Sequence, residues 1–144
     1  MTDGFTITRE FRAPRELVYE AWTTPRHFAA WFGGAASDVP VDSVSLDVRP
    51  GGAWKATMFA GPDRYQIDWK GEFTAVDPPS HLTLTISDGP EEGEPVTVDL
   101  TETDGVTTMV MTQSGGHLTP EQYEGAKAGW QTFFDVMQEI VEAR

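Results

Sequence analysis

The stretch that decides the fold is residues 125–144, "GAKAGWQTFFDVMQEIVEAR". Its apolar residues recur at spacings of three and four, which is typical of an amphipathic helix. Two glycines, Gly125 and Gly129, lie in its first half, although a glycine inside a helix costs about 1 kcal/mol relative to alanine. Bulky side chains follow at once, beginning with Trp130 and Phe134. The side chains that this helix presents are small in its N-terminal half (the small end) and bulky in its C-terminal half (the large end). The surface that the helix covers has to accommodate both.

The residues ahead of this helix alternate between apolar and polar side chains, the pattern of β-strands with one buried face. The first such segment spans residues 5–11, and two short helical segments follow it, beginning near Pro14 and Pro25. Six further strand segments precede the last helix, over residues 44–48, 54–58, 64–76, 82–86, 96–100 and 106–112. Runs of strands beside segregated helices predict an α+β sandwich with an antiparallel sheet. No repeat or linker interrupts this order, so we expect one domain over residues 1–144.

Composition limits the classes of partner that the chain can bind. With 144 residues, of which 39% are hydrophobic, the chain is long enough for one core. Its formal net charge of -13 should repel nucleic acids and anionic membrane surfaces. We therefore expect no nucleic-acid partner. No run of residues is apolar and long enough to predict a membrane span.

The residue types also exclude several kinds of chemistry. There is no cysteine, which rules out disulfides, thiol nucleophiles and cysteine-bound zinc. The three histidines, His27, His81 and His117, lack the spacing of a metal-binding pair, and only His117 is kept as a candidate acid or base. Because no nucleophile, base and orienting group stand out together, we expect no catalytic residues, no metal and no cofactor. The N-terminus lacks a signal-peptide pattern, so the expected location is the cytoplasm.

Strand phase predicts which side chains face the last helix. The predicted set combines the inner face of the sheet with the bulky residues of the helix: Trp54, Met58, Tyr65, Trp69, Phe73, Met109, Met111, Trp130, Phe134 and Met137. Methionine adapts to irregular spaces, and glycines in the helix leave room beneath it. We therefore predict a partly hollow interior, lined by these residues, that binds a small apolar or aromatic molecule. The alternative is an ordinary filled core with glycines of no consequence.

Few polar side chains are expected near this interior. Arg9 shares a strand face with apolar residues, so it either forms a structural ion pair at the end of the sandwich or anchors the carboxylate or phenolate of a ligand. Of the other candidates, Tyr65, Gln113 and Asp68, only Tyr65 is retained, because strand phase puts it on the inner face. The acidic segment "EEGE", residues 91–94, is interpreted as a solvated loop.

Several motifs occur in the order seen in the SRPBCC superfamily, also called START-like or helix-grip proteins. They include "ITREFRAPRELVYEAWTTPRHFAAWFGG" near the N-terminus, then "DVRPGGAWKATM" and "WKGEFTAVDPPSHLTLT", and finally "GWQTFFDVMQEIVE" in the last helix. More narrowly, the chain resembles the branch named for activators of the 90-kDa heat-shock protein ATPase. The resemblance extends over nearly the whole chain, and it is specific for a fold rather than for an activity.

The resemblance implies a curved, seven-stranded antiparallel sheet that grips the C-terminal helix. Two short helices would follow the first strand, and a cavity would lie between the sheet and the long helix. Members of the superfamily bind lipids, polyketides, flavonoid-like or hormone ligands in that cavity, and some cyclise polyketides. The eukaryotic co-chaperones carry this module beside another domain, which these 144 residues do not include.

Three functions follow from these observations. The first is binding of a small hydrophobic ligand in the cavity, in a stress-related role. The second is catalysis by a cyclase- or hydrolase-like enzyme on an aromatic or polyketide-like substrate, with Tyr65 as its polar group. The third is a co-chaperone-like module that binds another protein. We expect the binding function rather than an enzyme, in a monomer or weak homodimer.

Overall fold

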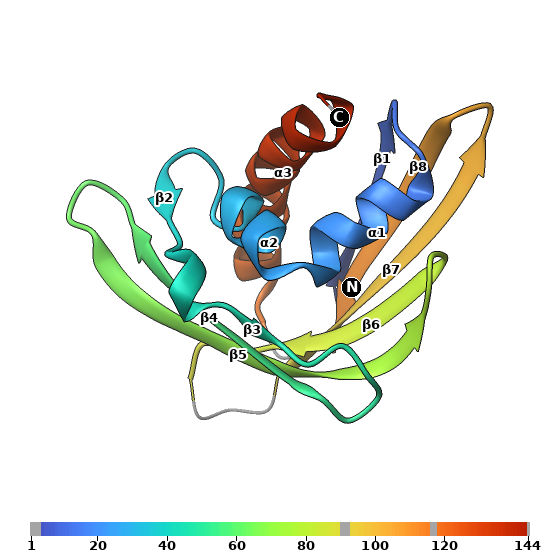
Figure 1. Ribbon diagram of the computed structural model, residues 1–144. Helices are drawn as coiled ribbons and strands as arrows, with labels where there is room; N and C mark the ends of the chain where they lie inside the picture. Colours follow the sequence, from blue (N-terminus) through green and yellow to red (C-terminus); the bar gives the residue numbers. More distant parts are fainter. Residues whose placement is uncertain (1–3, 90–92, 116–117, 144) are drawn as a thin grey trace.

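The alternating segments of the sequence join into one curved antiparallel sheet, and the helices lie on its concave side (Figure 1). The computed structural model describes residues 4–89, 93–115 and 118–143. In chain order its elements are β1 (Gly4–Phe11), α1 (Arg15–Thr23), α2 (Pro25–Trp31), β2 (Ser37–Asp38), the 3₁₀ helix η1 (Val41–Ser43), β3 (Ser45–Leu46), β4 (Ala53–Ala60), β5 (Tyr65–Asp77), β6 (His81–Ile86), β7 (Glu94–Thr103), β8 (Val106–Ser114) and α3 (Pro120–Glu142). Neighbours in the sheet follow the order β1-β8-β7-β6-β5-β4-β2, and β3 also pairs with β4.

The predicted α+β helix-grip fold is confirmed, with one difference in the number of strands. Within the described residues the sheet has eight strands, against the seven expected. The additional strand is β2, which pairs only Ser37 and Asp38 with β4. Two residues are too few to show an alternating pattern, so the sequence gives no signal for it. The strand expected over residues 44–48 is likewise reduced to the two residues of β3.

The C-terminal half of α3 fills the core of the sandwich. Phe134, Met137 and Val141 are fully buried and belong to one continuous hydrophobic cluster that extends across the sheet. Aromatic rings of the two short helices surround them: the ring centre of Trp31 lies 6.0 Å from that of Phe134 and 4.9 Å from that of Trp22. Edge-on and tilted contacts of this kind add to the stability gained from burial. The large end of α3 is therefore held firmly between the sheet and the short helices.

Gly71 of β5 lies where the indole of Trp54 passes over the strand. It lies opposite Trp54 of β4 in the strand register. The buried indole of Trp54 extends over Gly71, and its Nε1 donates a hydrogen bond of 2.8 Å to the carbonyl oxygen of Thr85 on β6. A Cβ at residue 71 would lie 1.8 Å from that oxygen and 2.4 Å from the indole nitrogen. Only glycine leaves space for this bond, which ties three neighbouring strands together.

We expect Gly71→Ala to lower the free energy of unfolding by about 2–4 kcal/mol, because the new methyl group forces the strands apart and breaks the buried indole hydrogen bond. Urea unfolding followed by tryptophan fluorescence measures the change. The matched control is Gly125→Ala in α3, where a Cβ meets nothing within 4 Å. That variant should be more stable by up to about 1 kcal/mol, because alanine is the better helix former. Equal stability of Gly71→Ala and the parent chain would contradict this account of the crossing.

Candidate functional site

A cavity of about 480 Å³ lies between the sheet and the N-terminal half of α3. Gly125 and Gly129 line it from the helix, and a Cβ built on either glycine would meet no atom within 4 Å. The two glycines thus leave space open rather than let the helix approach the sheet. The small end of α3 covers this cavity, while its large end fills the core.

One side of the cavity is apolar and aromatic. It is formed by the facing ends of β4 and β5, by Phe32 after α2, and by α3: the apolar lining residues there are Phe32, Met58, Ala60, Ile67, Trp69, Ala126, Trp130 and Phe133. The rings contact one another, with ring centres 5.4 Å apart for Phe32 and Phe133 and 6.0 Å apart for Phe32 and Trp69. Such a wall suits the apolar body of a small molecule, because burial of apolar surface is the main source of binding free energy.

The other side of the cavity is polar and belongs to β6, β7 and β8. Glu94, at the start of β7, and Gln113, near the end of β8, both line the cavity although both are 5% exposed. Gln113 Nε2 donates to Glu94 Oε1 at 3.0 Å, and the hydroxyl of Tyr123 donates to Glu94 Oε2 at 2.7 Å. Trp130 Nε1 in turn donates to Gln113 Oε1 at 2.9 Å. A buried carboxylate is stable here because both of its oxygens accept hydrogen bonds.

The start of α3 adds to the stability of this carboxylate. Thr119 and Gln122 form a capping box in which each side chain accepts a hydrogen bond from the other residue's backbone N–H. Tyr123, in the first turn of the helix, is the residue that donates to Glu94. The first turn of α3 therefore supplies a side-chain donor to this carboxylate, while its backbone N–H groups bond to the capping residues.

A second hollow, of about 640 Å³, lies on the opposite face of the sheet. Its lining includes Lys55, Lys70 and Glu72, whose side chains are exposed to solvent on β4 and β5. The first cavity differs because α3 covers part of it and because buried polar groups line it. We therefore take the first cavity as the candidate site.

The family described as "Activator of Hsp90 ATPase homolog 1-like protein" matches residues 12–142. The chain belongs to this family. The match extends from the end of β1 to the last residue of α3, so it includes every element that lines the cavity. The resemblance expected from the sequence, including the SRPBCC superfamily and its heat-shock activator branch, is thereby confirmed.

Solved structures give the same fold. The solution structure of an AHSA1-like protein from Aeromonas hydrophila is 27% identical, has a TM-score of 0.77, and is matched over 96% of this chain and 93% of that one. A crystal structure of a protein from Chromobacterium violaceum has a TM-score of 0.84 at 23% identity, over 98% and 99% of the two chains. DynU16, a protein of the dynemicin biosynthetic locus, matches with a TM-score of 0.80 at 24% identity, and this chain corresponds to 48% of its length. No curated protein matches the chain.

Four of the ten residues predicted to line a cavity do line it: Met58, Tyr65, Trp69 and Trp130. The other six are buried in the core outside it: Trp54, Phe73, Met109, Met111, Phe134 and Met137. These six residues therefore belong to an ordinary filled core, which is the alternative to a hollow interior. Strand phase identifies the inner face of the sheet, but it does not say which part of that face is covered by filled core and which part borders open space.

Sequence reasoning missed two polar residues of the cavity. The acidic residues before it predict a solvated loop for Glu94, yet it is buried at the start of β7. Gln113 is not among the residues predicted to line the cavity, yet it lines it. A signal for both exists in the sequence, because Glu94 is in phase with the buried Val96 and Gln113 with the buried Met111. Tyr65 lines the rim of the cavity and is 61% exposed.

Two further observations bear on the kinds of site that are present. Within residues 4–89, 93–115 and 118–143, no three His, Asp or Glu side chains gather in a way that could hold a metal ion. No helix in that part of the chain is long and apolar enough to cross a membrane. His117, the candidate acid or base, lies outside the described residues.

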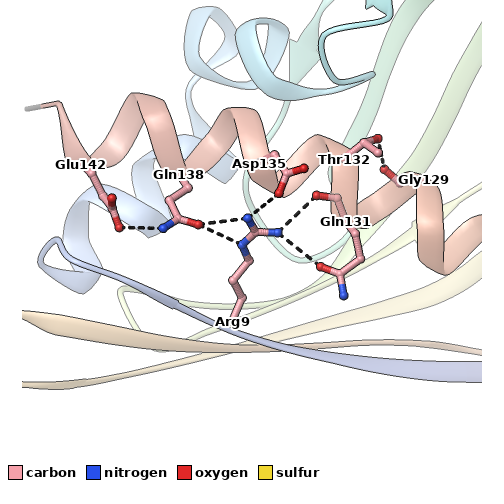
Figure 2. Close-up of polar contacts among 7 residues, drawn as sticks. All are labelled: Arg9, Gly129, Gln131, Thr132, Asp135, Gln138 and Glu142. Atoms are coloured by element: carbon pink, nitrogen blue, oxygen red, sulfur yellow. Dashed lines mark hydrogen bonds and ion pairs between the residues drawn. The ribbon is translucent and has the colours of Figure 1, made fainter.

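Arg9 connects β1 to α3 and does not line the cavity (Figure 2). Its guanidinium forms an ion pair with Asp135. Its Nε and Nη2 also donate to the side-chain oxygen of Gln138 at 3.1 and 3.0 Å, and its Nη1 donates to the backbone and side-chain oxygens of Gln131 at 3.2 and 3.3 Å. The structural ion pair is therefore the role that the geometry supports, and the guanidinium is not placed to anchor a ligand in the cavity.

We expect Arg9→Met to lower the free energy of unfolding by about 1–2 kcal/mol, because charge-assisted hydrogen bonds between β1 and α3 are lost at a partly exposed site. The indole N–H signals of Trp69 and Trp130 should keep their NMR positions, since the cavity lies elsewhere on α3. Arg12→Met is the matched control, because the Arg12 side chain is exposed on the same segment, and it should leave stability unchanged. Unchanged stability of Arg9→Met itself would show that this contact does not hold the helix to the sheet.

Proposed function

We propose that this protein binds a small apolar or aromatic molecule in the cavity beneath the N-terminal half of α3. The observation that carries the proposal is the pair of glycines, Gly125 and Gly129, that line open space although alanine would make a more stable helix. The volume of about 480 Å³ falls within the range of roughly 300–1,000 Å³ that is usual for small-molecule sites. The family to which the chain belongs commonly binds hydrophobic ligands, which supports the same function.

The ligand would place its apolar body against β4, β5 and α3. Burial there contributes roughly 25 cal/mol per Å² of apolar surface, and the loss of translational and side-chain freedom on association offsets part of it. The aromatic rings of Phe32, Trp69 and Phe133 offer both faces and edges to a ring or an acyl chain. Specificity would come from the polar side of the cavity.

The two other functions have less support in the geometry. The catalytic function depended on Tyr65, which is at the rim and mostly in water, whereas acid–base catalysis gains from an enclosed site. The protein-binding function rests on the family's name, and no described surface adds to it. Experiments can distinguish the catalytic and the protein-binding functions from small-molecule binding.

The direct test is a two-dimensional NMR titration of the indole N–H signals with fatty alcohols, flavonoids and aromatic polyketides. We expect saturable shifts that are largest for Trp69 and Trp130, because these two tryptophans line the cavity. Trp22 and Trp31, which are buried among the short helices, should shift much less. Turnover of ester or polyketide-like substrates in the same sample, abolished by Tyr65→Phe, would instead favour the enzyme.

A cavity-filling variant provides the control. In Gly129→Leu the new side chain extends into the open space, so the shifts should disappear while the fold is retained. Ala128→Leu adds the same bulk on the exposed face of the same turn and should leave binding unchanged. Shifts that persist in Gly129→Leu would mean that the molecules bind elsewhere, and the proposed function would be wrong.

A further inference from the structure

We propose that the cavity selects neutral or cationic amphiphiles whose polar end donates hydrogen bonds, and that it discriminates against carboxylates and other anions. This inference rests on the proposed function, because it names the class of ligand for the same site. It follows from the distribution of charge around the cavity rather than from its volume.

Among the residues that the structure describes, every charged side chain that lines the cavity is acidic. Glu94 lies at the polar side and Asp88 follows β6 beside it. No lysine or arginine within the described ranges lines the cavity. Arg9, the one cation that the sequence offered as an anchor for an anionic ligand, is bound to α3 instead. A carboxylate entering this space would meet like charge and would find no lysine or arginine among the described lining residues.

The hydrogen bonds on the polar side of the cavity lead to Glu94, whereas the Nε1 donor of Trp69, on the aromatic side, has no partner among the described residues. The hydrogen bonds run from Trp130 to Gln113 and from Gln113 to Glu94, and Tyr123 donates to the same carboxylate. A carboxylate is a pure acceptor with several lone pairs, so it favours groups that donate. Amine and hydroxyl groups match this chemistry, and hydrogen bonds between a cation and a carboxylate are stronger than neutral ones.

The N-terminus of α3 would ordinarily attract an anion to this end of the sandwich. Here its capping box uses the side chains of Thr119 and Gln122, and Tyr123 of the first turn donates to the internal carboxylate. The field of the whole protein acts in the same direction, because the formal net charge is -13. Local and global charge therefore both disfavour an anionic ligand.

Three probes with the same alkyl chain test the inference: decan-1-ol, decylamine as its ammonium ion, and decanoate. Each is titrated below its aggregation concentration at neutral pH, with affinity measured by calorimetry and by the indole signals of Trp69 and Trp130. We expect the alcohol and the ammonium ion to bind, and decanoate to bind at least about tenfold more weakly. Decanoate binding as tightly as decanol would overturn the charge selection while leaving the proposed function intact. Failure of all three probes to bind would overturn the proposed function instead.

Variants separate the cavity charges from the charge of the whole protein. Glu94→Gln and, independently, Asp88→Asn should narrow the difference in affinity between decylamine and decanoate. Asp88 is exposed, so its variant remains informative if Glu94→Gln does not fold. Glu139→Gln is the matched control, because it changes the net charge equally on the exposed face of α3 and should leave the difference unchanged. An equal effect of Glu139→Gln, or decylamine binding that survives in Gly129→Leu, would show attraction to the protein surface and would overturn the inference.

Discussion

The structure depends on how one helix covers a curved sheet. The large end of α3 places Phe134, Met137 and Val141 into the core, where the rings of α1 and α2 hold them. The whole of α3 lies on the concave side of the sheet (Figure 1). In its N-terminal half the helix presents Gly125 and Gly129, and the space between helix and sheet stays open there. The same helix therefore supplies the stability of the fold at one end and the roof of a cavity at the other.

Stability and the candidate site are separated along α3 by this arrangement. Arg9 holds the helix to β1 through Gln131, Asp135 and Gln138, all outside the cavity. In the N-terminal half, Tyr123 and Trp130 connect the helix to β7 and β8 through hydrogen bonds to Glu94 and Gln113. A protein organised in this way can tolerate an unfilled space, because contacts on both sides of the cavity fix the helix. The helix contains glycine, a poor helix former, only at Gly125 and Gly129, where it covers the open space.

The sequence was sufficient for the architecture, because period-two alternation and the spacing of α3 are local patterns. It was not sufficient to predict how deeply each side chain is buried. Phe73 and Met109 share a face with Trp69 and Met58, but they are part of the filled core and do not line the cavity. Met109, for example, accepts a hydrogen bond from the indole of Trp22 on α1. Glu94 looked solvated because its neighbours are acidic, and only the approach of Tyr123 and Gln113 from distant segments makes its burial stable. The role of Gly71 depends on Trp54 and Thr85 meeting across three strands, which no local pattern reveals.

The central claim is that the glycines of α3 roof an open apolar cavity. A crystal structure of this chain under xenon pressure tests it most directly, because xenon enters apolar cavities that have room for it. The account predicts a xenon site between Gly129 and the indole of Trp69, and its loss in Gly129→Leu. An α3 whose N-terminal half lies directly against β4 and β5, with the rings of Trp69 and Phe133 filling the space and no xenon bound, would contradict it.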